Sequence, residues 1–142
     1  MIYLDTGCLL KLYYPEPESR RVVELVAGNP IVYLSLHELE ATNALQLKRY
    51  RKEATASQVD KTRQLLTHDL QAGVLHRPAL SAEDLLQDSV VTAGAYTGSI
   101  GCRSLDILHC VAARHLAATS FVTTDKRQRK LATKLGLHCP SV

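Results

Sequence analysis

Two aspartates of this 142-residue chain stand directly after strand-like segments, where a side chain can reach a bound ligand. Asp5 ends the apolar run "MIYLD", and Asp125 ends the β-rich run "SFVTTD". Each is followed by a segment with helical character, so each carboxylate is expected at the C-terminal tip of a strand. Either acid alone could be a helix N-cap or first-turn residue, which the helix dipole favours. Two such acids favour a site in the crevice beyond the strand ends.

A third candidate acid lies in the helix predicted over residues 36–52, "LHELEATNALQLKRYRK". At about 100° per residue, one stripe of this helix is expected to be buried. The stripe consists of Leu36, Leu39, Asn43, Leu47 and Tyr50. Glu40 lies against its edge, whereas Glu38 points to the opposite side with Arg49. A buried carboxylate needs a partner, so Glu40 is the candidate for the site; the alternative is that it extends to the rim or pairs with an arginine.

The fourth candidate acid is Asp106, in the segment "GCRSLDILHCVAARHLAA". Wound as a helix from Ser104, this segment is apolar almost all round, with Arg114 as its main solvent-facing residue, which predicts a buried central helix. Asp106 falls inside the apolar arc in the first turn, where the helix dipole alone could also accommodate it. His109, one turn further on, is interpreted as a packed, hydrogen-bonded histidine and not as a ligand. No thiolate joins this group, so a soft metal is not indicated.

Four carboxylates that converge on one crevice need a charge partner. Like charges about 4 Å apart repel by about 4 kcal/mol per pair at an effective dielectric constant of about 20, so the group must bind protons or a cation. An all-oxygen set of carboxylates and waters suits Mg²⁺ or Mn²⁺. A hard divalent ion flanked by lysine and arginine is the arrangement that phosphodiester hydrolysis uses.

Basic residues are concentrated in two runs of the sequence. The runs "LKRYRK" (47–52) and "DKRQRKLATK" (125–134) hold nine of the seventeen Lys and Arg residues, although the net charge is only +3. Either run alone could be a solvated helix face. Two runs on a small chain that also carries buried acids favour an acidic polymer or an acidic partner.

The segments that must position these acids alternate between short apolar runs and longer stretches of helical period. Strands are predicted at 2–4, 31–34, 73–75 and 120–124, and 137–139 is a candidate fifth strand. Helices are predicted at 17–28, 36–52, 55–72, 82–95, 104–117 and 126–135. Ser35, Ser81 and Ser104 are predicted N-caps, and Gly28, Gly73 and Gly136 stand near helix ends. This alternation predicts an α/β fold with a mainly parallel sheet of four to five strands and helices on both faces.

Length and composition predict one domain over residues 1–142. The N-terminal segment has an acid in its middle and no basic region before it, so no signal peptide is predicted. No apolar stretch approaches the ~20 residues that a membrane span requires. The cysteines lack the close pairs of a zinc site, so Cys8, Cys102, Cys110 and Cys139 are interpreted as reduced, mostly buried thiols. We therefore expect a cytoplasmic protein without a membrane partner.

Four sequence blocks, taken in order, resemble those of the PIN-domain nucleases, most closely the VapC-type toxins of bacterial toxin–antitoxin pairs. "MIYLDTGCLLKLYYPEPES" resembles the opening strand and first acid of that family, with Thr6 as the usual small hydroxyl residue. "SLHELEATNAL" resembles the second block, in which the acid three residues before "NAL" corresponds to Glu40. "CRSLDILHCVAA" resembles the third block and contains Asp106. "FVTTDKRQRKLATKLGL" resembles the fourth, with Thr123 and Asp125, so the resemblance spans almost the whole chain.

This resemblance implies a Mg²⁺-dependent endoribonuclease that hydrolyses phosphodiester bonds in single-stranded or loop RNA. In this interpretation Asp5 and Asp106 ligate Mg²⁺ directly, and Mn²⁺ is an alternative ion. Glu40 takes part through the metal or through water and helps to orient the nucleophile. Asp125 completes the acidic pocket through water. A water molecule attacks in line and leaves a 5′-phosphate and a 3′-hydroxyl.

The resemblance also implies partners for the chain. Members of the family are usually dimeric and are inhibited by an antitoxin that is encoded beside them, so we expect a homodimer and a cognate antitoxin. Arg49, Lys126 and Arg127 are basic residues that would hold the RNA backbone through contacts that are independent of base sequence. Gly7 departs from the family pattern, which commonly has a second hydroxyl there, and this affects a minor polar contact only.

Two interpretations from other classes remain open at this point. The chain could be an inert PIN-like scaffold that binds a partner without cleaving RNA, although the presence of all four acids argues against loss of activity. A receiver-like signalling domain, phosphorylated on an aspartate at a strand tip, would also place acids above a parallel sheet and bind Mg²⁺. Such a domain needs paired acids at its first strand, and Asp5 has no acidic neighbour.

Overall fold

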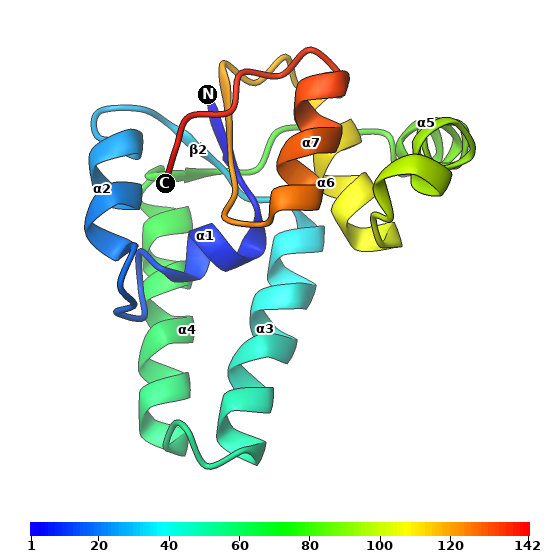
Figure 1. Cartoon of the computed structure of the whole chain (residues 1–142). Helices are drawn as coiled ribbons and strands as arrows, with labels where there is room; N and C mark the ends of the chain where they lie inside the picture. Colours follow the sequence, from blue (N-terminus) through cyan, green and yellow to red (C-terminus); the bar gives the residue numbers. More distant parts are fainter.

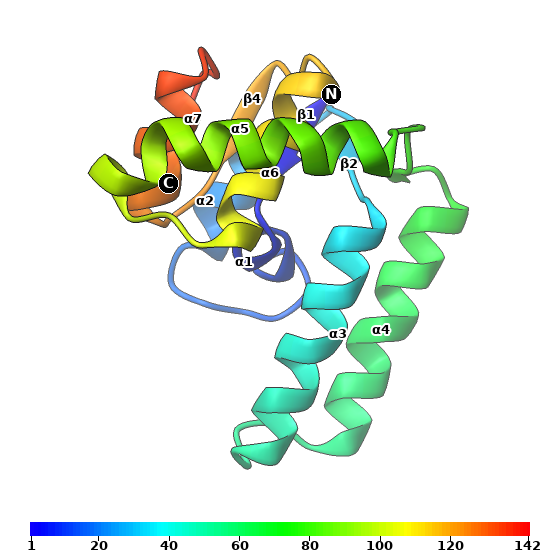
Figure 2. The same ribbon diagram turned by 90° about the vertical axis from the view of Figure 1, so that its right-hand side faces the viewer.

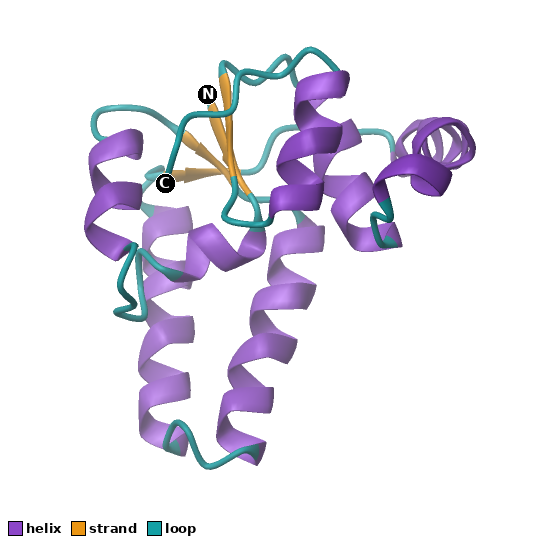
Figure 3. Ribbon diagram, viewed as in Figure 1, coloured by secondary structure: helices purple, strands orange, loops and turns teal.

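Four short strands form the central sheet of the computed structural model, which describes residues 1–142. They are β1 (Ile2–Leu4), β2 (Ile31–Val32), β3 (Leu75–His76) and β4 (Ser120–Val122). The strand order is β3-β2-β1-β4 and every pairing is parallel, with Tyr3 opposite Phe121 and Ile31 opposite Leu75. Figure 3 shows the strands at the centre of a mostly helical molecule. The predicted α/β fold with a parallel sheet is confirmed.

The candidate fifth strand at 137–139 is not formed. The segment lies beside β4, where the Phe121 N–H donates to the carbonyl oxygen of His138 at 2.8 Å. Pro140 follows almost at once and has no N–H to donate, so this single bond is not extended into a ladder. The sheet therefore has four strands, at the lower limit of the prediction.

Helices surround the sheet on both sides (Figure 1). They are α1 (Thr6–Leu10), α2 (Ser19–Val26), α3 (Ser35–Tyr50), α4 (Ala56–Gln71), α5 (Ala82–Ile100), α6 (Ser104–His115) and α7 (Lys126–Lys134). All six predicted helices are present, and α1 is a short helix that starts directly after Asp5. α5 continues past its predicted end at residue 95 because the left-handed residue that ends it is Gly101, at φ 76°. None of the helices combines the length and the apolar character needed to cross a membrane.

Two of the three predicted serine N-caps were wrong. Ser81 does cap α5, since its hydroxyl accepts from the Asp84 N–H at 3.2 Å. The N-cap residues of α3 and α6 are instead Leu34 and Arg103, one position before the predicted serines. In both helices the side chain three residues after the cap accepts the N–H of the cap residue itself, so the first turn is stabilised by a side chain within the helix and not by a serine cap.

The sheet is covered on both faces because successive residues of a strand point to opposite sides. On one face, Ile2 and Leu4 pack with buried residues of α1, α2, α3 and α4. On the other face, Tyr3 and Phe121 pack with α6 and α7, and α5 lies across the outside of α6 (Figure 2). α3 and α4 run side by side and extend well beyond the sheet (Figure 1, Figure 2). Neighbouring strands β1 and β4 carry the two strand-tip aspartates to the same edge.

Candidate active site

Asp5 is a buried carboxylate at the junction of β1 and α1, as predicted from its place in the sequence. The side chain caps α1, with Oδ1 accepting from the Cys8 N–H at 2.6 Å and Oδ2 accepting from the Thr123 hydroxyl at 2.5 Å. Burial raises the pKa of Asp5 above its ordinary value, although the bonds from Thr123 and Cys8 act in the opposite direction. Both oxygens are therefore positioned by neutral donors, and burial leaves the charged form less favourable than it is in water.

Thr123 connects the two strand-tip aspartates. This fully buried residue follows β4, and its hydroxyl oxygen accepts from the Asp125 N–H at 3.0 Å while its proton is directed at Asp5. Asp125 caps α7, since its Oδ1 accepts from the N–H groups of Arg127 and Gln128 at 2.7 and 3.0 Å. Asp125 is thus an N-cap and also a neighbour of Asp5 through one hydroxyl, and its Oδ2 has no protein hydrogen bond.

The buried stripe predicted for α3 was wrong. The residues of α3 that are buried are His37, Ala41 and Leu45. Members of the predicted stripe face outward, with Leu39 65%, Leu47 39% and Tyr50 84% exposed, and Asn43 is exposed as well. The core of the α1–α4 side packs on Ala41 and Leu45, so the buried face is rotated away from Leu39, Leu47 and Tyr50. Because Leu45 is the one large apolar residue among the three buried ones, this face gave too weak a hydrophobic signal to be found in the sequence.

Glu40 nevertheless reaches the region of Asp5, and Glu38 does not. The Thr6 hydroxyl, one residue after Asp5, donates to Glu40 Oε2 at 2.6 Å, and His109 Nε2 contacts the same oxygen. Burial alone would raise the pKa of Glu40, but the contacts with His109 and Thr6 outweigh it, so the pKa lies below its ordinary value. Glu38 is exposed and pairs with Arg77 at 2.7 Å. The partner of Glu40 is a histidine, and not the arginine considered from the sequence.

Asp106 lies in the first turn of α6, with 19% of its side chain exposed. Its Oδ2 accepts from the Arg103 N–H at 3.1 Å and is 3.7 Å from Arg103 Nε. The buried Gln128 amide connects this turn to α7, because Nε2 is 3.5 Å from the Asp106 carbonyl oxygen while Oε1 is 2.7 Å from the Thr123 hydroxyl. Asp106 therefore joins the other acids indirectly, and its Oδ1 has no protein hydrogen bond.

The chemistry of these oxygen donors fits a hard divalent cation. No three His, Cys, Asp or Glu side chains are grouped closely enough to form a metal site on their own. Mg²⁺ commonly takes one or two carboxylates and keeps several waters, so a pair such as Asp5 and Asp106 suits it in ligand type and number. The buried charge of Asp5 gains most from such an ion, because its own donors leave it unfavourable. All four cysteines are free thiols, and Cys8, Cys102 and Cys110 are buried as expected.

Residues other than the acids also belong to the candidate site, and the sequence analysis did not assign them to it. His109 is 2% exposed, as expected for a packed histidine, yet it also contacts Glu40. Its position three residues after Asp106, on the same buried side of the helix, could have indicated that His109 belongs to the site. Tyr3 and Gln128 were not identified, although Gln128 stands three residues after the capping Asp125, where a side chain returns toward the helix start.

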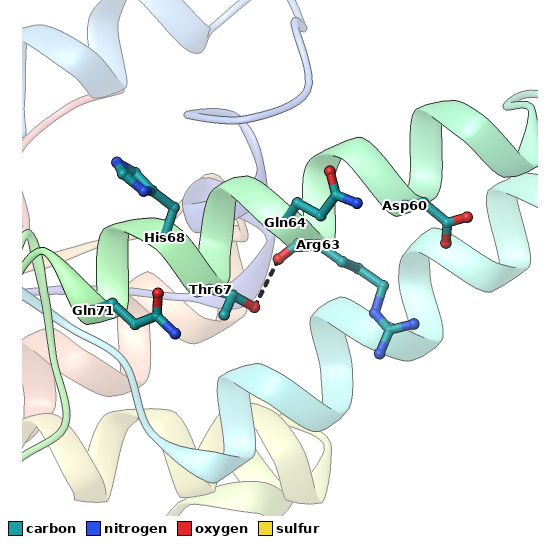
Figure 4. A pocket seen from close by; sticks show the side chains of 6 residues that line it. All are labelled: Asp60, Arg63, Gln64, Thr67, His68 and Gln71. Atoms are coloured by element: carbon teal, nitrogen blue, oxygen red, sulfur yellow. Dashed lines mark hydrogen bonds between the residues drawn. The ribbon is translucent and has the colours of Figure 1, made fainter.

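A polar hollow of about 410 Å³ on α4 is separate from this site (Figure 4). It is lined by Asp60, Arg63, Gln64, Thr67, His68 and Gln71. All of these belong to one helix, and none of the four candidate acids is among them, so the hollow does not collect side chains from different elements (Figure 4).

Comparison with known proteins identifies the family. A family model described as PIN domain matches residues 2–134, which is nearly the whole chain. The chain therefore belongs to the PIN domain family, and the resemblance seen in the four sequence blocks is confirmed.

Solved structures share this fold across the full chain. One is the crystal structure of VapBC2 from Rickettsia felis bound to a DNA fragment from their promoter, with TM-score 0.63, 17% identity, and coverage of 99% of this chain and 98% of that chain. Another is FitAcB from Neisseria gonorrhoeae, with TM-score 0.63, 14% identity, and coverage of 99% and 97%. At these identities the likeness establishes the fold alone. No protein with a curated description matches the chain.

Proposed function

We propose that this PIN-domain protein is a Mg²⁺-dependent endoribonuclease that hydrolyses RNA phosphodiester bonds. The observation that carries the proposal is the connected group of acids at one edge of the sheet. The Thr123 hydroxyl joins the Asp5 carboxylate to the backbone N–H of Asp125, and Thr6, the neighbour of Asp5, donates to the Glu40 carboxylate. A buried carboxylate with a raised pKa beside further acids is unfavourable for stability alone and is typical of a functional site.

The four acids would have different roles in the reaction, set by the groups that surround each of them. Asp5 and Asp106 would hold Mg²⁺, which when bound supplies positive charge at the scissile phosphate and lowers the pKa of a bound water. Glu40 Oε2 is fixed by Thr6 and His109, so the unbonded Oε1 would orient the attacking water and take its proton. Asp125 would complete the pocket through water, using its unbonded Oδ2.

Basic side chains near these elements would bind the RNA backbone. Lys126 and Arg127 are exposed in the first turn of α7, directly after Asp125. Arg49 is exposed toward the end of α3, the helix that carries Glu40. Such contacts neutralise phosphates without reading bases, so binding should weaken steeply as salt is added.

We further propose that the protein acts in the cytoplasm as the toxin of a type II toxin–antitoxin pair, as a homodimer inhibited by a cognate antitoxin. The VapC-like sequence blocks support this role, and the fold is shared with the VapBC2 structure. Its test is co-expression with the protein encoded beside it. Rescue of growth by that neighbour, together with co-purification of the two proteins, is the expected result, and toxicity unchanged by the neighbour would contradict the pairing.

The nuclease activity is tested with a fluorogenic single-stranded RNA. Cleavage is expected with Mg²⁺ or Mn²⁺ and is expected to stop when EDTA removes the ion, since the buried Asp5 carboxylate has only neutral hydrogen-bond donors. Cleavage that survives complete chelation would contradict the mechanism. Absence of cleavage on all RNAs under all divalent ions would favour the inert, partner-binding PIN scaffold instead. Membership of the PIN family leaves no support for the receiver-like alternative.

A further inference from the structure

His109 is a buried histidine of α6 whose ring touches the Glu40 carboxylate of α3. It is 2% exposed, and its Nε2 contacts Glu40 Oε2. A carboxylate oxygen can only accept, so the hydrogen of this contact must be carried by Nε2. The contact is a hydrogen bond from the imidazole to the carboxylate, and such charge-assisted bonds are among the strong ones.

Thr6 provides a second donor to the same oxygen. Its hydroxyl donates to Glu40 Oε2 at 2.6 Å and lies 3.2 Å from His109 Nε2. Two donors from different elements, α1 and α6, therefore converge on Oε2, whereas Oε1 has no protein hydrogen bond. This arrangement fixes the rotation of the carboxylate and leaves one oxygen available for a reactant.

The imidazole of His109 is itself held rigidly. Its Nδ1 lies 2.9 Å from the hydroxyl of Tyr3, a fully buried residue of β1. Its ring packs on His37, with centroids 4.9 Å apart, and His37 is fixed by the Leu34 N–H at 3.0 Å and the Leu4 carbonyl at 2.9 Å. The orientation of Glu40 is thus tied through His109 to the backbone of the sheet.

We propose that His109 is a positioning residue that holds Glu40 in the orientation required for water activation. The inference rests on the proposed nuclease function for its chemical meaning. It goes beyond that function by assigning a role to a residue outside the acid set, and it requires no change in the charge of the ring. If His109 served only to fill the core, a leucine of similar size would replace it without affecting the reaction rate.

The test compares three variants in single-turnover RNA cleavage at matched folded concentration. His109→Leu should lower the rate by about 10- to 100-fold with little change in KM, which is the usual effect of removing a group that orients a reactive ligand. His109→Gln keeps an N–H donor at a similar reach and should recover most of that loss. His115→Gln is the matched control, because His115 lies on the same helix but bonds to Asp88 at 2.6 Å and not to the acids.

A double-mutant cycle with Glu40→Gln separates positioning from structure. If His109 acts through Glu40, then His109→Leu should have little further effect on the rate once Glu40 has been replaced. The inference is overturned if the full loss persists in the Glu40→Gln background, if His109→Gln is as slow as His109→Leu, or if His109→Leu cleaves at the wild-type rate.

A second readout does not depend on activity. NMR relaxation of the Glu40 side chain in the metal-free protein should show an ordered side chain in wild type and His109→Gln, and a mobile one in His109→Leu. Equal order in all three would overturn the inference. A wild-type protein that cleaves no RNA but shows this pattern would contradict the proposed function and leave the positioning role in place.

Discussion

Asp5 and Glu40 are neighbouring acids whose pKa values the fold shifts in opposite directions. Asp5 is 8% exposed, and neutral donors, a backbone N–H and a threonine hydroxyl, bind its two oxygens. Glu40 keeps 22% of its side chain exposed, and a histidine and a threonine bind one of its oxygens. The pKa of Asp5 is raised by burial, whereas the pKa of Glu40 is lowered because the contacts with His109 and Thr6 outweigh its partial burial.

This difference indicates which acid needs a cation. Two neutral hydrogen bonds do not offset the desolvation of a buried carboxylate, so the Asp5 charge remains costly until an opposite charge arrives. The Glu40 charge is already accommodated by the protein. Asp5 is therefore suited to bind the metal, and Glu40 is suited to orient water beside it.

The largest effect on RNA cleavage is expected when the buried charge of Asp5 is removed. Asp5→Asn should lower RNA cleavage by at least about 1,000-fold, because a metal-binding carboxylate is lost. The same change should leave the melting temperature unchanged or raise it. Asparagine is a good N-cap and can still accept from the Cys8 N–H, and Thr123 can then donate to Gln128 Oε1, which is 2.7 Å away. Single-turnover kinetics and thermal melts measure the two quantities.

Asp60→Asn is the matched control for this substitution, since Asp60 is an exposed acid of α4 that lines the separate hollow. It should change neither rate nor stability appreciably. A large loss of stability in Asp5→Asn would show that the Asp5 charge contributes to folding, and the contrast with Glu40 would then disappear.

Glu40→Gln should reduce the cleavage rate by about 100-fold while the protein remains folded. Glu38→Gln should stay within a few-fold of wild type, because Glu38 is exposed and its pair with Arg77 contributes only about 0–1 kcal/mol to stability. Single-turnover cleavage by both variants at matched folded concentration is the measurement. An inactive Glu38→Gln with an active Glu40→Gln would reverse the assignment of the second acid.

The choice between Glu38 and Glu40 shows how much of the site could be predicted from the sequence. Family spacing and helical geometry both selected Glu40, and Glu40 is the one bonded to Thr6 and His109. Helical periodicity selected Glu40 correctly, although the stripe of α3 that it predicted to be buried was wrong. Large apolar residues such as Leu39 and Tyr50 were expected inside, but packing with the neighbouring helices buries His37 and Ala41 instead. Periodicity within one helix cannot reveal which side its neighbours will cover.

The fold itself was predictable because its signals are local. Short β-rich runs and long helical periods alternate clearly, and a parallel sheet follows from that alternation. The residues that cap each helix, and the candidate fifth strand, were harder to predict from the sequence. Each depends on a single hydrogen bond, such as the bond from the Arg103 N–H to Asp106. The connections at the site, through Thr123, His109 and Gln128, join residues far apart in the chain and could not be found from spacing alone.

The third prediction concerns metal-dependent stability. Mg²⁺ at about ten times its dissociation constant should stabilise wild type by about 1.4 kcal/mol, or about 3–5 °C in melting temperature. Asp5→Asn should lose this shift, whereas Glu40→Gln should retain most of it. Thermal melts with NaCl at matched ionic strength provide the control. An equal shift in wild type and Asp5→Asn would place the ion elsewhere on the protein.

The smallest expected effect is in the pH dependence of unfolding, measured by denaturant titration in EDTA. Because the folded-state pKa of Asp5 is raised, its penalty is absent below the ordinary value of 3.8 and grows as the pH rises through the folded-state pKa. Because the folded-state pKa of Glu40 is lowered, its contribution is present above 4.5 and is lost as the pH falls through the folded-state pKa. The two acids should therefore act with opposite signs in different pH windows.

Differences between wild type and each variant isolate these contributions from the rest of the protein. Burial and the adjacent His109 lower the pKa of His37 to about 3, so every variant should lose stability as the pH falls below about 6.5. This loss is common to wild type and Asp5→Asn, whereas Glu40→Gln also lacks the Glu40 charge that favours protonation of His37, which adds to its difference from wild type. As the pH falls through the folded-state pKa of Asp5 toward 3.8, wild type should gain stability relative to Asp5→Asn. Below 4.5 it should lose stability relative to Glu40→Gln. If wild type instead lost stability relative to Asp5→Asn on acidification, the Asp5 charge would be favourable in the folded protein, and the argument that this acid needs a cation would fail.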